Sequence, residues 1–172
     1  MGPQAAPNPD VASLGQIARL REIGLFGGLS DEVLDSFVGK LEVLKLAPGD
    51  VVFREGEMGR DMFVVVDGEM EVLRHSKRGH ETRVAMLGPS DWFGEMSILD
   101  VLPRSATVRA LAPARLLRLT AHELDALYRR DLKAYSLLTL NIAREMSRRL
   151  RVADGLLAEL VTNVMDEYTR RK

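Results

Sequence analysis

The residues with the clearest chemical potential lie close together between Trp92 and Ala110. Gly94 has no Cβ, so the backbone at that point can approach a ligand closely. Residues 95–99 are predicted to form a short helical turn, and the free amides at its start favour an anion. Arg104 adds a planar fork of donors that suits phosphate, and an ionised Glu95 accepts hydrogen bonds from sugar hydroxyls. Together these residues indicate a site for a phosphate joined to a ribose.

Short runs of β-forming residues surround this stretch, and glycine or proline turns divide them. Asp67-Gly68 lies between two alternating runs and predicts a hairpin, because such a turn needs positive φ. Short strands at even spacing are typical of antiparallel sandwiches and jelly-roll barrels. We therefore expect a mainly β fold with flanking helices, in which a jelly-roll barrel over 41–119 is built from runs 41–46, 51–54, 62–66, 70–74, 82–87, 106–110 and 115–119.

Helices are expected before the barrel. Three prolines in residues 1–10 predict a flexible lead. Apolar residues at helical spacing predict a first helix over Val11–Ile23. Ser30 is a good N-cap for a second helix that ends near Val38. Residues 11–40 are thus predicted as N-terminal helices that carry no chemistry.

Residues 120–172 are predicted as C-terminal helices. Thr120 begins a short helix, with Glu123 in the capping-box position, and Asp131 begins a long one. Apolar residues of the long helix are spaced 4, 3, 4, 3 and 4 apart, as in a coiled-coil seam: Met146, Leu150, Ala153, Leu157, Leu160 and Val164. The seam could pack on the barrel alone, but it is longer than a small barrel can cover. We therefore expect a homodimer through this helix.

Composition excludes several classes of protein. The 172 residues contain no cysteine, which excludes a disulfide framework, a zinc knuckle, an iron–sulfur site and a cysteine nucleophile. No run of about 18 apolar residues predicts a transmembrane helix, and the first residues lack the basic and apolar regions of a signal peptide. We expect a soluble, cytoplasmic protein. Residues 129–151 carry seven basic and two acidic side chains, which we interpret as a solvated helix face, with nucleic acid or a membrane surface as alternatives.

The stretch from Phe93 to Val108 resembles the phosphate-binding cassette of the cyclic-nucleotide-binding domain, the family of catabolite activators and protein kinase A regulatory subunits. The cassette reads Phe-Gly-Glu-(Leu/Met)-(Ala/Ser)-(Leu/Ile)-Leu, then Pro-Arg-(Ala/Ser/Thr)-Ala-(Thr/Ser)-Val, and nearly every position matches. The resemblance covers residues 25–150. It implies a jelly-roll barrel that binds cAMP or cGMP and passes a signal to a partner. The sequence has no Gly-x-Ser-x-Gly elbow and no P-loop, so we expect no catalysis.

The resemblance also implies roles for individual residues. Glu95 would accept from the ribose 2′-hydroxyl, and Arg104 would pair with the cyclic phosphate. Arg149 matches an arginine that bridges the ligand site and Glu95 in the catabolite-activator type. The other implied site residues are the phosphate cradle and cassette positions Gly94, Met96, Ser97, Ser105 and Ala106, and the apolar walls Met86, Leu87 and Phe93.

The residues that would select the base give a mixed pattern. In this family a Thr after the cassette arginine accompanies cGMP, whereas Ala or Ser accompanies cAMP, so Ser105 favours cAMP. The catabolite-activator type contacts adenine with two hydroxylic residues of the long helix. This chain has Ala153 and Asp154 at those positions, which removes the expected hydrogen bonds.

Three other functions make different demands on the sequence. A cupin-like barrel enzyme needs about three histidines and a carboxylate on one metal, whereas His75, His80 and His122 are scattered. A transcription regulator would append a helix-turn-helix, but the chain stops at Lys172, so we expect no direct DNA binding. A protein-interaction module whose cassette binds nothing would have Glu95 and Arg104 as a surface ion pair. The effector protein that would read the signal is not indicated.

Overall fold

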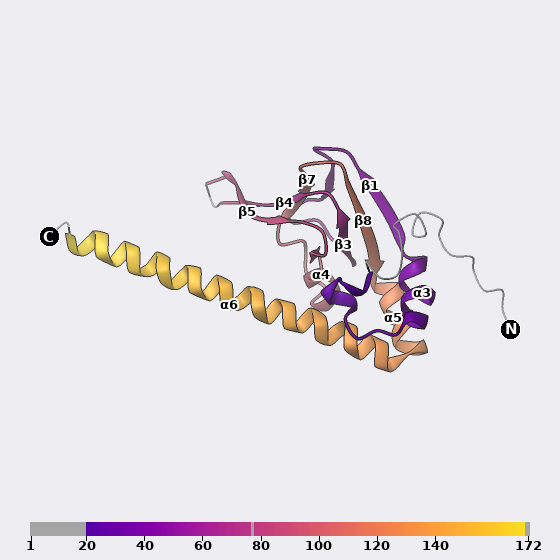
Figure 1. The fold of residues 1–172 in the computed structure, drawn as a ribbon. Coiled ribbons are helices and arrows are strands. Elements are labelled where there is room, and N and C mark those ends of the chain that lie inside the picture. The colour runs from indigo at the N-terminus through magenta and orange to yellow at the C-terminus, as the bar shows by residue number, and fades with distance from the viewer. Residues whose placement is uncertain (1–19, 77, 171–172) are drawn as a thin grey trace.

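Eight strands form two four-stranded antiparallel sheets (Figure 1). The structure is a computed structural model that describes residues 20–76 and 78–170. One sheet has the order β1-β8-β3-β6 and the other β2-β7-β4-β5. The strands are β1 (Glu42–Leu46), β2 (Val51–Phe53), β3 (Asp61–Asp67), β4 (Met70–His75), β5 (Glu81–Leu87), β6 (Trp92–Phe93), β7 (Thr107–Ala110) and β8 (Ala114–Thr120).

The chain passes from one sheet to the other at almost every connection, which is the jelly-roll arrangement expected from the sequence. Only β4 and β5 follow one another within a sheet. The two-residue strand β6 was not predicted. It exists because Trp92 and Phe93 pair with Val64 and Phe63 at the edge of the first sheet.

The hairpin predicted at Asp67-Gly68 is wrong. Strands β3 and β4 belong to different sheets, so this turn is a corner between the sheets. Gly68 does have positive φ, 89°. A Cβ at this position would lie 2.5 Å from the Pro113 carbonyl oxygen and from the Ala114 Cβ. The glycine is therefore required by close packing at the corner as well as by its φ.

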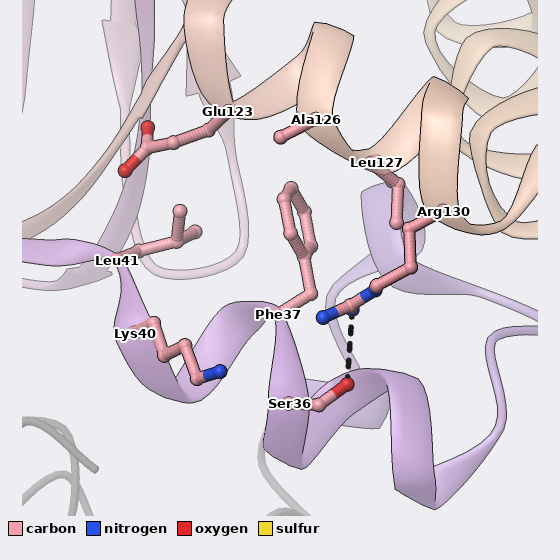
Figure 2. A pocket seen from close by; sticks show the side chains of 8 residues that line it. All are labelled: Ser36, Phe37, Lys40, Leu41, Glu123, Ala126, Leu127 and Arg130. Carbon is pink, nitrogen blue, oxygen red and sulfur yellow. Dashed lines mark hydrogen bonds between the residues drawn. The ribbon is translucent and has the colours of Figure 1, made fainter. Parts of the chain in front are cut away.

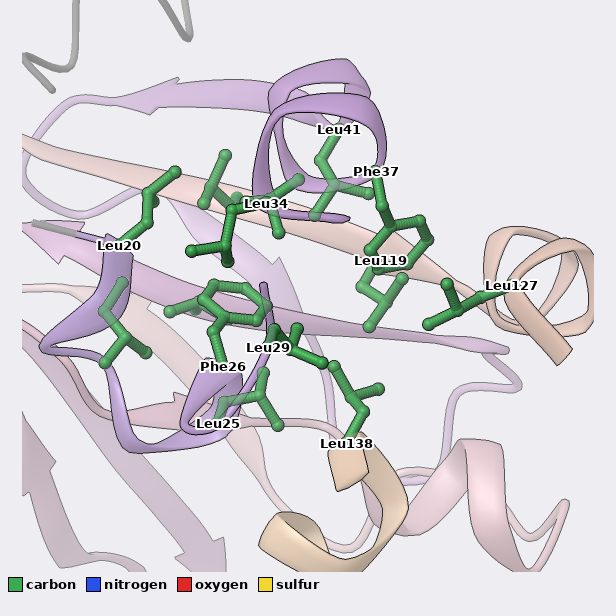
Figure 3. Packing of buried hydrophobic residues seen from close by; sticks show 14 of the residues in the cluster. Leu20, Leu25, Phe26, Leu29, Leu34, Phe37, Leu41, Leu119, Leu127 and Leu138 are labelled. Carbon is green, nitrogen blue, oxygen red and sulfur yellow. The ribbon is translucent and has the colours of Figure 1, made fainter. Parts of the chain in front are cut away.

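The central strands β3 and β8 of the first sheet bury side chains on both faces, because side chains alternate along a strand. On β8, Leu116 points into the barrel and joins Phe63, Phe93 and Val108. Leu117 and Leu119 point the other way, into a second cluster that the helices complete (Figure 3). Leu34 and Phe37 come to that cluster from α3 and its C-cap, Leu127 from α5 and Leu138 from α6. This cluster fixes the helices on the barrel.

Three short helices precede the barrel: η1 (Gly24–Phe26), α3 (Asp31–Ser36) and η2 (Val38–Lys40). The four-residue α4 (Met96–Leu99) lies between β6 and β7, and the longer α5 (Ala121–Arg130) and α6 (Leu132–Arg170) follow the barrel. The Ser30 hydroxyl accepts from the Val33 amide, as predicted, but α3 ends at Ser36 and a 3-10 turn follows. Of the predicted helix Val11–Ile23, residues before Leu20 lie outside the described part, as does the lead 1–10.

Helix α6 runs beneath the barrel and continues well past it (Figure 1). Arg149 is the last described residue of α6 that is not exposed, and every side chain from 150 to 166 is exposed. This segment, here called the free end of α6, displays large apolar side chains that are 55–66% exposed: Leu150, Val152, Leu156, Leu157, Leu160, Val161, Val164 and Met165. Within the described ranges, no helix has the length and apolar character needed to cross a bilayer.

The capping box at the start of α5 is present as predicted. The Thr120 hydroxyl accepts from the Glu123 amide, and the Glu123 carboxylate accepts from the Thr120 amide at 2.7 Å. Thr120→Ala removes the cap and is expected to destabilise the protein by about 1 kcal/mol, which lowers Tm by about 2–4 °C for a chain of this size. Thermal unfolding checks this, with Thr162→Ala on the free end of α6 as the control. Equal Tm values for the two variants would contradict it.

Candidate ligand-binding site

A cavity of about 300 Å³ opens between the second sheet, the segment from β6 to α4, and α6. This volume lies at the low end of the range for small-molecule sites. It is lined by Phe53, Val72, Ala85, Leu87, Phe93, Gly94, Glu95, Met96, Ser97, Arg104, Ser105, Ala106, Val108 and Arg149. Ten of the eleven site residues chosen from the sequence are in this set, and they come from β5, β6, α4, the loop before β7, and α6.

Met86 is the exception. It is 55% exposed and does not line the cavity, although the sequence placed it in an apolar wall. Successive side chains on a strand point to opposite faces. Because Ala85 and Leu87 face the cavity, Met86 must face outward.

Four lining residues were missed: Phe53, Val72, Ala85 and Val108. They form one row across the second sheet, because Phe53 pairs with Val108, Val108 with Val72, and Val72 with Ala85. Each is an ordinary apolar strand residue. Their common position follows from the register of four strands, which no local sequence signal reveals.

Arg104 lies at the buried end of the cavity and is only 4% exposed. Its Nη1 donates to the Asp61 carbonyl oxygen at 2.7 Å and to the Gly94 carbonyl oxygen at 3.1 Å. Its Nη2 donates to the Asp61 carboxylate, and the guanidinium stacks 4.0 Å from the centre of the Phe53 ring. A Cβ on Gly59 would lie 2.6 Å from Nη2. The guanidinium therefore fills a space shaped for it.

Asp61 is shared between two arginines. Arg118 on β8 donates from Nε to the Asp61 Oδ2 at 2.7 Å, and from Nη1 to Glu42 at 3.0 Å. Burial lowers the pKa of Arg104, and the Asp61 charge opposes that effect. Hydrogen bonds to Glu42 and Asp61 raise the pKa of Arg118. Both guanidinium groups stay charged. The Asp61 carboxylate therefore balances the buried charge of Arg104 and holds Arg104 against the first sheet.

Glu95 and Arg104 do not form a surface ion pair. Glu95 is 6% exposed, and its Oε1 accepts from Arg149 Nη1 at 3.4 Å. Arg104 pairs with Asp61 instead. Each of the two buried groups thus has its own partner, and both line the same cavity.

The backbone around Glu95 is arranged as the sequence suggested. Gly94 has φ of 84°, and a Cβ there would lie 2.9 Å from Arg104 Nη1. Helix α4 starts at Met96, and the amides in a first turn have no partner within the helix. The Ser105 hydroxyl lies 3.8 Å from the Met96 sulfur at the cavity wall. This end of the cavity offers donors to an anion, whereas the row of Val72 and Ala85 offers an apolar surface.

A second cavity of about 190 Å³ lies where α5 meets the N-terminal helices (Figure 2). The Phe37 ring lies between Leu41 and Leu127, and Arg130 Nη2 donates to the Ser36 hydroxyl at 3.0 Å. None of the cassette residues lines it. Among the described residues, no three His, Cys, Asp or Glu side chains are grouped to hold a metal ion.

Comparisons with known proteins agree with this geometry. A profile of the cyclic nucleotide-binding domain matches residues 43–131. The cyclic AMP receptor protein of Thermus thermophilus is 35% identical over 130 residues, which are 76% of this chain and 58% of the relative.

Two solved structures resemble the fold. The Thermus thermophilus catabolite activator protein has a TM-score of 0.71 at 35% identity, over 80% of this chain and 62% of that one. The regulatory domain of Toxoplasma gondii PKA, solved with cAMP, has a TM-score of 0.61 at 27% identity, over 72% of this chain and 46% of that one. The chain thus spans less than two thirds of the length of each of these relatives.

Asp61→Asn tests the role of Asp61 as the counterion of Arg104. The substitution leaves a buried guanidinium with a neutral partner, so we expect a loss of about 2 kcal/mol in the free energy of unfolding of nucleotide-free protein. Asp67→Asn on the same strand is the control, because Asp67 pairs with Arg115 in a more exposed position and should lose less than about 1 kcal/mol. Denaturant unfolding measures both. Similar losses in the two variants would mean that Asp61 has no special role.

Proposed function

Because the chain belongs to the cyclic nucleotide-binding domain family, we propose that it is a cyclic-nucleotide sensor that binds cAMP in preference to cGMP and changes the position of α6 in response. The main support is the buried Arg104 guanidinium, which faces a cavity that also holds Glu95 and an apolar row. A cyclic phosphate needs a charged donor such as Arg104, a ribose needs an acceptor such as Glu95, and a purine needs an apolar surface. The proposed sensor performs no catalysis and acts in the cytoplasm.

In the proposed complex, the cyclic phosphate accepts from Arg104, from the Ser105 hydroxyl and from the amides at the start of α4. The ribose 2′-hydroxyl donates to Glu95, which Arg149 holds. The base lies toward the apolar side chains of β4 and β5, where Val72 and Ala85 pair. Each part of the ligand then meets a surface of matching polarity.

The preference for cAMP has two supports. Ser105 follows the cassette arginine at the position where the family carries Ala or Ser with cAMP. The names of two similar proteins refer to cyclic AMP: the receptor protein of Thermus thermophilus and the Toxoplasma gondii PKA domain solved with cAMP. Ala153 and Asp154 of α6 do not line the cavity, so they do not contact the base in the proposed complex.

The proposed switch is a movement of α6 over the cavity mouth. Arg149 already joins α6 to the cavity through Glu95 and the Trp92 carbonyl. A bound phosphate would add a second anion to Arg104 and weaken its hold on Asp61, which lies beside the start of α5 because Asp61 pairs with Thr120. Ligand moves such an equilibrium only if it binds one arrangement more tightly than the other. An effector protein would read the new arrangement.

The free end of α6 supports a homodimer. Its exposed apolar side chains include Leu150, Leu157, Leu160 and Val164 of the predicted seam, whereas Met146 packs against the barrel. An exposed apolar stripe of this length is typical of an interaction surface, and the 4–3 spacing suits a parallel coiled coil with a second copy.

Calorimetric titration with cAMP and with cGMP tests the proposed ligand. We expect micromolar or tighter binding of cAMP and weaker binding of cGMP. Arg104→Ala should weaken cAMP binding about 100-fold or more, because it removes a buried, charge-paired donor of the phosphate. Arg104→Lys keeps the charge without the fork and should lose about tenfold.

Arg74→Ala is the matched control, because Arg74 is an exposed strand residue that does not line the cavity. Extraction of the purified protein identifies any nucleotide that already fills the site. No binding and no extracted nucleotide would refute the sensor and leave a protein-interaction module with a non-binding cassette.

Leu157→Glu tests the homodimer. A carboxylate in the seam would be buried against its copy without a partner, so we expect wild type to sediment as a dimer and Leu157→Glu as a monomer. Asn163→Glu, an exposed polar position of the same helix, should remain dimeric. Sedimentation velocity at several concentrations measures this, and a monomeric wild type would refute the proposed dimer.

A further inference from the structure

Arg149 uses its three donor groups in three directions. Nε donates to Glu145 Oε1 at 2.8 Å, Nη2 to the Trp92 carbonyl oxygen at 2.8 Å, and Nη1 to Glu95 Oε1 at 3.4 Å. The guanidinium also lies 5.9 Å from the centre of the Trp92 ring. A planar guanidinium held at three points has one orientation. The loss of any one contact therefore allows the guanidinium to rotate away from its other two partners.

Glu145 is the only one of these partners that lies on α6 itself. It precedes Arg149 by one turn, which is the favourable order for an acidic and a basic residue on a helix. Its side chain is 11% exposed, and its second oxygen pairs with Arg148. The pair is therefore better shielded from water than an ordinary ion pair on a helix surface.

Arg149 lies where the packed part of α6 ends. Beyond Arg149, every described side chain of α6 up to residue 166 is exposed. Arg149 is thus the last partly buried residue in the part of α6 whose side chains are described, and it contacts Glu95 of the cavity and Trp92 of β6.

We propose that Glu145 is a positioning residue of the ligand cavity, which orients the Arg149 guanidinium so that Arg149 holds Glu95 for the ligand and ties α6 to β6. Glu145 does not line the cavity itself and acts only through Arg149. The proposal rests on the proposed function, because Glu95 is positioned for the ribose of a cyclic nucleotide.

Binding is measured by calorimetric titration with cAMP. Glu145→Ala should raise Kd about tenfold, and Arg149→Ala should raise it by a similar factor. The double variant should be no more than about twofold weaker than either single variant, because both remove the same interaction. Glu145→Gln keeps an acceptor for Arg149 Nε and should remain within about threefold of wild type.

Glu159→Ala is the matched control, since Glu159 is an exposed residue on the free end of α6, and it should bind as wild type does. A Glu145→Ala variant that loses thermal stability but keeps the wild-type Kd would overturn the proposal. So would additive losses in the double variant.

A second readout does not need ligand. Trp92 is the only tryptophan in the chain, so intrinsic fluorescence reports on the contact between β6 and α6. In nucleotide-free protein, Glu145→Ala and Arg149→Ala should change the emission maximum and acrylamide quenching in the same direction, while Glu159→Ala should not. Unchanged fluorescence in Glu145→Ala would overturn the positioning role. If wild type binds neither nucleotide, the proposed function fails and this readout still decides whether Glu145 positions Arg149.

Discussion

A buried guanidinium is the constraint around which the site is built. Arg104 is almost completely shielded from water, and a cation in that position is stable only with an anion and hydrogen bonds. Asp61 supplies both, the anion from its carboxylate and a hydrogen-bond acceptor from its carbonyl oxygen, and it is itself held by Arg118. Without ligand the charge of Arg104 is balanced by Asp61. An anionic ligand would compete with Asp61 for a guanidinium that already lies at the cavity.

The same carboxylate connects the cavity to the helices that follow the barrel. Asp61 pairs with Thr120, the N-cap of α5, and the Arg60 carbonyl oxygen accepts from the Ala121 amide at 2.8 Å. Strands β3 and β8 are buried on both faces, so they cannot move without disturbing the helical cluster. A change in the partners of Arg104 would thus alter the surroundings of Asp61, which lies beside the start of α5, and α5 packs on α6. This proximity gives a physical route from ligand to helix position.

Helix α6 has two different halves. Its first part contributes Leu138 and Ile142 to the helical cluster, and Arg149 closes the contact with the barrel. The free end carries the apolar stripe that we assign to a second copy. A helix tied to the cavity at one end and to a partner at the other would transmit a change in tilt or register, because a helix is stiff over this length.

Local sequence signals determined much of this protein: the strands between glycine and proline turns, the caps at Ser30 and Thr120, and the cassette from Phe93 to Ser105. Such features depend on residues within one or two turns of each other. Asp61 as the partner of Arg104, the row from Phe53 to Ala85, and the outward direction of Met86 were decided by tertiary structure. The row and the direction of Met86 depend on which strands pair and in which register, because a one-residue change in register turns every side chain to the other face. The contact between Asp61 and Arg104 joins a strand to a loop 43 residues later, a distance over which no local signal acts.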